Sequence, residues 1–149
     1  TNLYGPNDNF DLNSSHVLPA MIRKFHEAKL NGNLPVELWG TGSPMREFLH
    51  VDDLARAVLF ALENTLEEHL YNVGTGVDLS IRELAEQVQS IVKHRGKIIW
   101  DKEKPNGTPR KIMKSSKFNR YGWKSKINLK EGIQSTINWF IENIDDIKK

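Results

Sequence analysis

Cationic side chains in two loops are the residues of this sequence best suited to binding phosphate groups. Arg46 follows a Gly/Pro loop at residues 40–44, and Arg110 and Lys111 close a second one at residues 104–111. A guanidinium offers a fixed, bidentate fork to phosphate oxygens and keeps its charge at any working pH. Adjacent cations repel unless an anion lies between them, so this pattern predicts a small anionic ligand. The alternative for Arg46 is a surface ion pair with Glu47 or Asp52.

Histidines and carboxylates form a second set of candidates. Taken alone, His16 at the start of a predicted helix is more often a structural or solvated residue than a catalytic one. The run from His50 to Asp53 contains side chains that bind metals. Helix capping by Asp52 and buried packing of His50 account for this run, so we predict no metal site there.

Alternating short strands and helices must position these residues, which predicts an α/β fold. A capping box at Ser80 and Glu83 is the best-defined helix start, whereas Ser14 or Ser15, and then Asp52, are the expected caps of the two earlier helices. The predicted strands are residues 36–39, 47–51, 70–73 and 97–100. The predicted helices are residues 17–31, 53–64, 81–94, 115–121 and one that begins at 128.

The helix at residues 53–64 is apolar around most of its circumference, so it needs burial on two sides. A chain of 149 residues has difficulty covering both faces. The chain also opens in mid-element, at residues 1–6, without a methionine. We therefore expect a single domain, residues 1–149, cut from a longer protein. Residues 1–12 and roughly 47–64 are expected to pack against the part that is absent.

Composition excludes several classes of function. The 21 basic and 19 acidic residues are spread along the chain and give a net charge of +2, with no basic block of the kind that binds nucleic acid. There is no cysteine, so no disulfide framework. No apolar run reaches the roughly 18 residues of a membrane span, and we expect a cytoplasmic protein. Neither a G-x-G-x-x-G fingerprint nor a Tyr-x-x-x-Lys motif occurs.

Three segments together carry a family resemblance: residues 1–6 (TNLYGP), 44–53 (PMREFLHVDD) and 72–76 (NVGTG). In this order they resemble the extended short-chain dehydrogenase/reductases that act on nucleotide sugars, the NAD-dependent epimerase/dehydratase family. A finer resemblance, through residues 13–20, 39–48 and 104–111, is to the GDP-L-fucose synthases. It implies an NADP-dependent epimerase and reductase that converts GDP-4-keto-6-deoxy-D-mannose to GDP-L-fucose, of which this chain is the carboxyl-terminal, substrate-binding part without most of the Rossmann domain.

The resemblance also assigns roles to individual residues. It makes His16 the acid/base residue of the epimerisation, working with a cysteine that this chain lacks, and it places Thr1, Asn2 and Leu3, together with His16, near the nicotinamide of NADP(H). It implies that Arg46 and Lys111 bind the diphosphate of the substrate, with Arg110 as a further candidate. Substrate contacts are implied for Lys24, Trp39 and Asn106.

Alternatives remain open for several of these residues. Lys24 is otherwise a solvated helix lysine, and Trp39 an ordinary core aromatic. Asn106 departs from the family, whose members carry an aspartate there, and this puts the base preference in question. We expect the chain alone neither to bind NADPH tightly nor to turn over substrate, and the parent enzyme to be a homodimer. The competing functions are another nucleotide-sugar epimerase or dehydratase, and a non-catalytic nucleotide-sugar binding module.

Overall fold

Strand β3 (Met45–His50) lies at the centre of the main sheet, in a computed structural model that describes residues 1–147. Strands β1 (Asn2–Tyr4) and β6 (Arg110–Lys111) pair with it in parallel, and β4 (Asp78–Ser80) pairs with it antiparallel. β4 and β6 both pair with the first residues of β3, so they lie on opposite edges of it. β1 pairs with the last residues of β3, on the same edge as β6. Segments far apart in sequence therefore meet at Met45 and Arg46.

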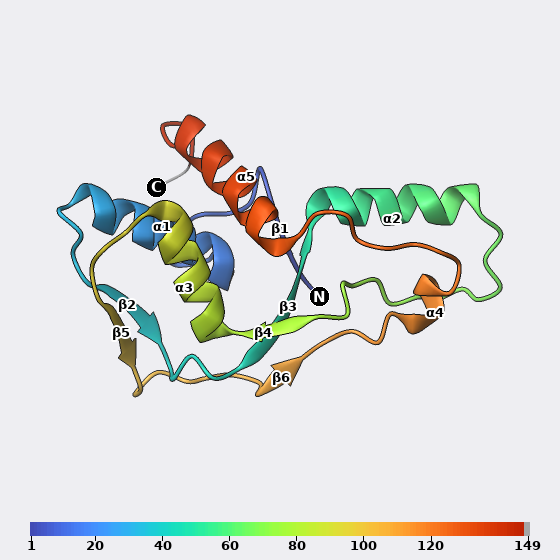
Figure 1. Cartoon of the computed structure of the whole chain (residues 1–149), viewed down its shortest axis with the longest axis horizontal. Coiled ribbons are helices and arrows are strands. Elements are labelled where there is room, and N and C mark those ends of the chain that lie inside the picture. The colour runs from blue at the N-terminus through green and yellow to red at the C-terminus, as the bar shows by residue number, and fades with distance from the viewer. Residues whose placement is uncertain (148–149) are drawn as a thin grey trace.

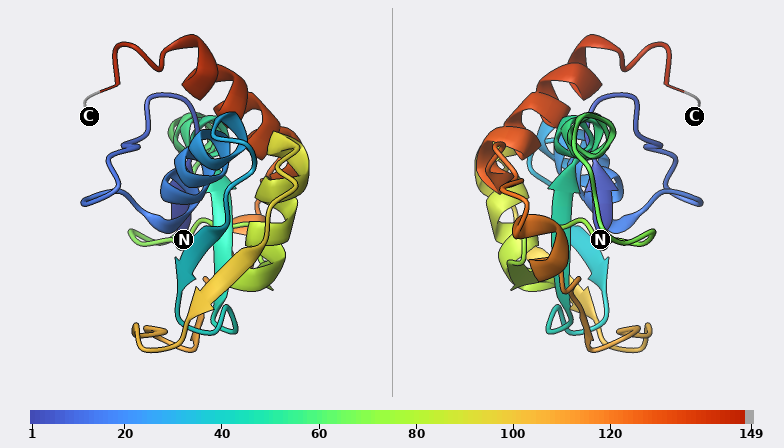
Figure 2. Two further views of the ribbon diagram at one scale, coloured as in Figure 1. Left: turned by 90° about the vertical axis from the view of Figure 1, so that its left-hand side faces the viewer. Right: turned by 90° about the vertical axis from the view of Figure 1, so that its right-hand side faces the viewer.

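A separate sheet of two parallel strands lies beside the first. Strands β2 (Val36–Trp39) and β5 (Ile98–Asp101) align so that Trp39 faces Asp101. Along β2, Val36 and Leu38 are buried while the residues between and after them are exposed, which is the alternation expected of a half-buried strand. In Figures 1 and 2 these strands lie on the side of the molecule opposite α5 (Leu129–Glu142).

Three helices enclose the principal core. Helices α1 (Val17–Leu30), α3 (Ile81–Val92) and α5 each contribute residues from one apolar stripe. Aromatic side chains fill much of the space between them: the rings of Phe10 and Phe140 are 4.7 Å apart. The buried members of this cluster include Tyr4, Phe10, Leu18, Ile22, Phe25, Phe48, Leu84, Val88, Ile133 and Phe140.

Helix α2 (Val51–Glu63) extends away from this core toward the opposite end of the molecule (Figure 1). One face packs on a smaller cluster of Leu49, Ala57, Phe118 and Trp123, which includes α4 (Ser116–Asn119). The other face is open. Its large apolar side chains are exposed at Val58 (53%), Leu59 (57%) and Leu62 (79%), as the two-sided apolar pattern predicted.

The predicted helix starts are confirmed at α3 and α5. Ser80 and Glu83 form both hydrogen bonds of the capping box, and Asn128 accepts from the Glu131 amide at the start of α5. The predicted caps of α1 and α2 are wrong. His16 occupies the cap position of α1 without a side-chain hydrogen bond, because Ser14 bonds to Asp11 and Asn9 instead.

At α2 the cap is His50, not Asp52. Its Nδ1 accepts a hydrogen bond from the Asp52 amide at 3.2 Å, so an imidazole performs the task usually given to a carboxylate or hydroxyl. His50 is buried, as predicted.

Two predictions about strands also need correction. Residues 70–73 are not a strand, because Leu70 is 81% exposed and the segment joins no ladder. The short strand in this region is β4, several residues later. The segment 104–111 is a loop only up to Pro109, because its last two residues form β6. No helix within residues 1–147 is long and apolar enough to span a membrane.

Candidate functional site

Arg46 and Lys111 face each other across neighbouring strands. They are register partners in the parallel pair β3–β6, so both side chains leave the sheet on the same face. The Arg46 guanidinium donates from Nη1 to the Met45 carbonyl at 2.8 Å. Within residues 1–147 neither cation forms an ion pair with a carboxylate, so the suggested partners Glu47 and Asp52 are not used. Like charges placed directly opposite are unfavourable without a counterion.

Arg110 projects to the other face of the same strand pair. Its guanidinium donates to both carboxylate oxygens of Asp78, from Nε at 2.6 Å and from Nη2 at 3.1 Å. The hydrogen bonds from Arg110 lower the pKa of Asp78 below its ordinary value of 3.8. The expected repulsion between Arg110 and Lys111 is therefore relieved by strand alternation and by Asp78 rather than by a bound anion, and Arg110 is not a neighbour of Lys111 on the same face.

The loop between β5 and β6 is attached to the turn that separates β2 from β3. Asn106 Oδ1 accepts hydrogen bonds from the Thr41 amide at 2.7 Å and from the Thr41 hydroxyl at 3.0 Å. A backbone N–H can only donate, so this amide oxygen is assigned without ambiguity. Gly40 has φ +74°, and a Cβ there would lie 2.3 Å from Asn106 Oδ1. The next residue, Gly107, lies beside the Arg46 guanidinium.

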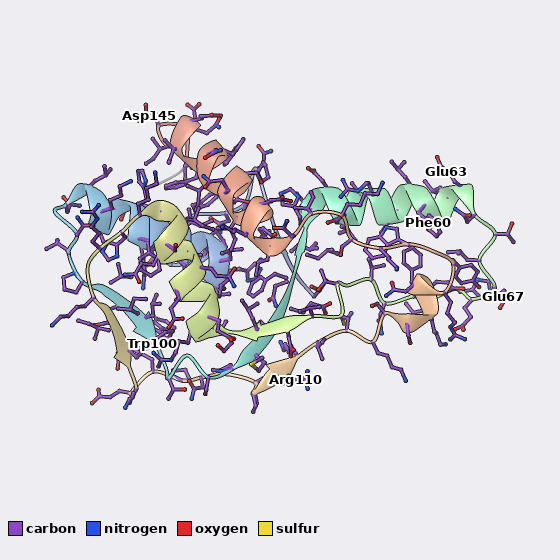
Figure 3. All side chains as sticks on the ribbon, in the orientation of Figure 1. Phe60, Glu63, Glu67, Trp100, Arg110 and Asp145 are labelled. Carbon is purple, nitrogen blue, oxygen red and sulfur yellow. The ribbon has the colours of Figure 1, made fainter. Side chains whose placement is uncertain are left out.

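Trp39 is 61% exposed, which excludes the alternative of an ordinary core aromatic. The ammonium of Lys104 lies 5.7 Å from the centre of its ring. An exposed indole beside a cation presents a flat surface to a sugar or base, with an N–H available for hydrogen bonding. In Figure 3 Trp100 and Arg110, on β5 and β6, mark the same edge of the molecule.

Lys24 lies within α1, whereas His16 is the cap residue before it. Lys24 Nζ donates to the carbonyl of Glu37 on β2 at 3.0 Å, which brings it beside the strand that carries Trp39. His16 is an exposed residue at the helix start. Asp8 is its charged neighbour: burial raises the pKa of Asp8 above 3.8, while the Asn9 amide and the charge of His16 oppose that rise.

The first three residues lie along the carboxyl-terminal half of β3. Asn2 and Leu3 pair with Phe48 and Leu49, and the side chains of Thr1 (3.3 Å) and Asn2 (2.9 Å) donate to the carbonyl of Glu47. Leu3 is 39% exposed. The structure thus brings together Trp39, Arg46, Asn106 and Lys111, places Lys24 next to β2, and holds residues 1–3 on the following part of β3.

Sequence reasoning missed the role of Glu47. Its side chain is fully buried, and its carboxylate accepts from the Gly76 amide at 2.6 Å, the Met113 amide at 2.8 Å and the Thr75 hydroxyl at 3.2 Å. It therefore joins the loop before β4 and the segment after β6 to the centre of β3. The signal available in the sequence was a carboxylate directly before the apolar residues Phe48 and Leu49 of the strand.

Asp53 has the same character. It is fully buried, accepts from the amides of Lys126 at 2.8 Å and Ile127 at 2.9 Å, and pairs with Arg56. His50 Nδ1 is likewise occupied by the Asp52 amide. Burial, the largest influence, lowers the pKa of His50 below 6.5. His50 and Asp53 thus have structural partners, and within residues 1–147 no group of three or more metal-binding side chains occurs.

Comparison with known proteins decides the family. The model of the NAD dependent epimerase/dehydratase family matches residues 1–74, and relatives named as GDP-L-fucose synthases match 97–100% of the chain. Probable GDP-L-fucose synthase 1 of Oryza sativa subsp. japonica is 55% identical over 149 residues, and GDP-L-fucose synthase of Escherichia coli (strain K12) is 48% identical over 155 aligned positions covering 97% of the chain. The chain belongs to the NAD-dependent epimerase/dehydratase family.

The solved structures of this family agree with the fold. A GDP-L-fucose synthetase from Naegleria fowleri, also solved bound to NADP, superposes on all of this chain with a TM-score of 0.92 at 30% sequence identity. The chain covers 46% of that structure. It likewise covers 45% of the rice relative and 48% of the Escherichia coli one, so it spans about half the length of the epimerase/dehydratase relatives that it matches.

Proposed function

We propose that this chain is the GDP-sugar-binding part of a GDP-L-fucose synthase, an NADP-dependent epimerase and reductase that converts GDP-4-keto-6-deoxy-D-mannose to GDP-L-fucose. The observation that carries the proposal is the pair Arg46 and Lys111. Two cations leave one face in register and have no carboxylate partner within residues 1–147. A diphosphate supplies the missing negative charge, and relatives named as GDP-L-fucose synthases share 48–55% identity with this chain.

The surface around this pair suits the remainder of a nucleotide sugar. Trp39 offers its exposed ring to a base or sugar, and Gly107 borders the Arg46 guanidinium. Lys24, beside β2, adds a further cation on the side of Trp39. Bidentate hydrogen bonding by Arg46 fixes the orientation of a phosphate, whereas Lys111 acts as a point charge.

His16 is the proton carrier in this proposal. Epimerisation next to a ketone requires a base that removes the proton from the adjacent carbon and leaves an enolate, followed by return of a proton to the opposite face. An imidazole nitrogen titrates in the range where both transfers occur at neutral pH. His16 is exposed at the start of α1, so its ring is accessible to substrate. The second proton donor belongs to the part of the enzyme that this chain does not include.

The nicotinamide end of NADP(H) is assigned to Thr1, Asn2, Leu3 and His16. Bound NADPH supplies the hydride that reduces the ketone. The partly exposed Leu3 fits an apolar contact with the nicotinamide ring. The donors of Thr1 and Asn2 are already directed at the Glu47 carbonyl, so their contribution is to hold β1 against β3, leaving the Asn2 amide oxygen for a ligand.

The dinucleotide-binding domain covers the open face of α2 in this proposal. Val58, Leu59 and Leu62 give that face its apolar character, and residues 1–12 together with 47–64 form the contact. The intact enzyme is a homodimer whose contacts lie outside this chain. Alone, the 149-residue chain binds the GDP-sugar without turnover.

Replacement of His16 by asparagine in the intact enzyme tests the assignment of activity. Asparagine keeps a polar side chain at the cap position and cannot carry a proton near neutrality. Solvent-deuterium incorporation at the epimerised carbons is expected to fall about 100-fold, whereas reduction of an already epimerised ketone by NADPH falls much less. Equal losses in the two steps would make His16 a scaffold residue. Absence of NADPH oxidation with the GDP-keto sugar in the unmodified enzyme would refute the proposed function.

A further inference from the structure

The turn at residues 40–43, between β2 and β3, is held from both sides, by Asn106 and by Arg82, and no motif in the sequence marks Arg82. Arg82, the second residue of α3, donates from Nη2 to the Thr41 carbonyl at 2.7 Å, and its own amide donates to the Gly42 carbonyl at 2.9 Å. On the other side Asn106 accepts from the Thr41 amide and hydroxyl. Both polar groups of the Thr41 backbone are therefore occupied.

An aromatic ring completes this support. The Arg82 guanidinium lies 4.7 Å from the centre of the Trp100 ring. Gly42 has φ +76°, and a Cβ there would meet Trp100 at 2.7 Å, so only glycine allows the turn to lie against the ring. Arg82 forms no ion pair with a carboxylate within residues 1–147. Its planar group is committed to the ring and the turn.

The turn lies between two residues of the proposed ligand surface. Trp39 is the last residue of β2 and directly precedes Gly40. Arg46 is the second residue of β3, three positions after Ser43. Asn106 is followed by Gly107, which lies beside Arg46. A change in the path of the turn would therefore alter the spacing between the indole and the guanidinium, which must contact different parts of one ligand at the same time.

We infer that Arg82 is a positioning residue for nucleotide-sugar binding, which acts by fixing the Thr41 turn against Trp100 and thereby sets Trp39 relative to Arg46. The inference rests on the proposed function for the identity of the ligand. The effect of Arg82 on the turn is independent of the proposed function. Arg82 touches no part of the ligand in this account, so its charge is less important than its planar shape.

The test compares Arg82→Met and Arg82→Lys with the matched control Arg95→Met in the 149-residue chain. Arg95 is exposed, and its guanidinium makes no hydrogen bond to residues 1–147. Amide exchange reports the turn, and titration with GDP reports the ligand surface. We expect the Thr41 amide to exchange about tenfold faster in both Arg82 variants, with affinity for GDP about tenfold weaker, and the midpoint of thermal unfolding within about 3 °C of the unmodified chain. Arg95→Met is expected to change none of these.

Each other result overturns the inference. Unchanged exchange at Thr41 in Arg82→Met would show that the turn does not depend on the guanidinium. Faster exchange with unchanged GDP affinity would limit Arg82 to a structural role, and full GDP affinity in Arg82→Lys would show that charge alone matters. If the unmodified chain does not bind GDP, the proposed function fails. The exchange measurement then still decides whether Arg82 fixes the turn, and the part of the inference that concerns ligand binding falls with the function.

Discussion

Arg46 on β3 and Lys111 on β6 are register partners whose side chains leave the same face of the sheet. Two cations in this relationship repel each other in the empty protein and attract one diphosphate when it binds. Binding and stability should therefore respond in opposite directions when one cation is removed.

Lys111→Met is predicted to weaken GDP binding about tenfold without lowering the melting temperature of the ligand-free chain. Isothermal titration and thermal unfolding of the same samples measure both effects. Lys114→Met is the matched control, since Lys114 is an exposed lysine three residues away and outside the strand pair. A lower melting temperature for Lys111→Met with unchanged GDP affinity would mean that Lys111 has a structural role.

Arg110 and Asp78 should stabilise the sheet in a pH-dependent manner. The hydrogen bonds from Arg110 lower the pKa of Asp78, so the carboxylate favours the folded state above its ordinary pKa of 3.8, and this contribution is lost as the pH falls through the lowered value. Arg110→Lys, which cannot make the bidentate contact, is predicted to lower the melting temperature at pH 7. The difference from the unmodified chain should close at pH values below 3.8. Arg95→Lys serves as control, and a difference that is independent of pH would contradict the assignment.

Glu47 is predicted to be the most sensitive carboxylate of the sheet. Glutamine has one acceptor oxygen and an amide nitrogen that would face the N–H of Gly76 or Met113. Glu47→Gln should therefore reduce the free energy of unfolding by about 3 kcal/mol, because it leaves buried donors without acceptors. Urea denaturation measures this. The exposed Glu103→Gln is the control, and a loss for Glu47→Gln that does not exceed the control would show that the three hydrogen bonds contribute little.

His50 is predicted to make stability fall in mild acid. Burial, together with the charge of Arg56, lowers its pKa below 6.5, against the opposing effects of Asp52 and Asp53. The unfolded chain therefore binds a proton in a pH range where the folded chain does not, and stability decreases as the pH falls from 6.5 through the lowered pKa.

His50→Asn keeps a side-chain acceptor for the Asp52 amide and removes the titration. Its stability relative to the unmodified chain should improve as the pH is lowered from 8 to 5, on the scale of about 1 kcal/mol per pKa unit. Thermal unfolding across this range measures it. The exposed His69→Asn is the control, and a constant difference between His50→Asn and the unmodified chain would contradict the assignment.

The long elements of this fold could be predicted from sequence because their signals are local. Repeated apolar spacing gave α1 and α5, and the capping box gave the start of α3. Strands β4 and β6 have only three and two residues, too few for any periodicity, and they exist because β3 lies between them. Their positions depend on contacts that no local pattern contains.

The candidate site divides in the same way. Resemblance to the family selected Arg46, Lys111, Trp39 and Asn106, which the structure brings together. The partnership of Arg110 with Asp78 joins residues 32 positions apart across β3, and sequence alone assigned Arg110 to an anion instead. The cap at His50 was missed because imidazole is seldom a cap, although the burial of His50 was predicted.

The central claim is that Arg46 and Lys111 form the diphosphate site of a surface that prefers guanine nucleotides. Its most direct test is thermal unfolding of the 149-residue chain with equal concentrations of GDP, UDP, dTDP and CDP, repeated with Arg46→Met and Lys111→Met. The account predicts the largest rise in melting temperature with GDP and a much smaller rise in each variant. Equal shifts for all four nucleotides, or a GDP shift that survives both substitutions, would contradict it.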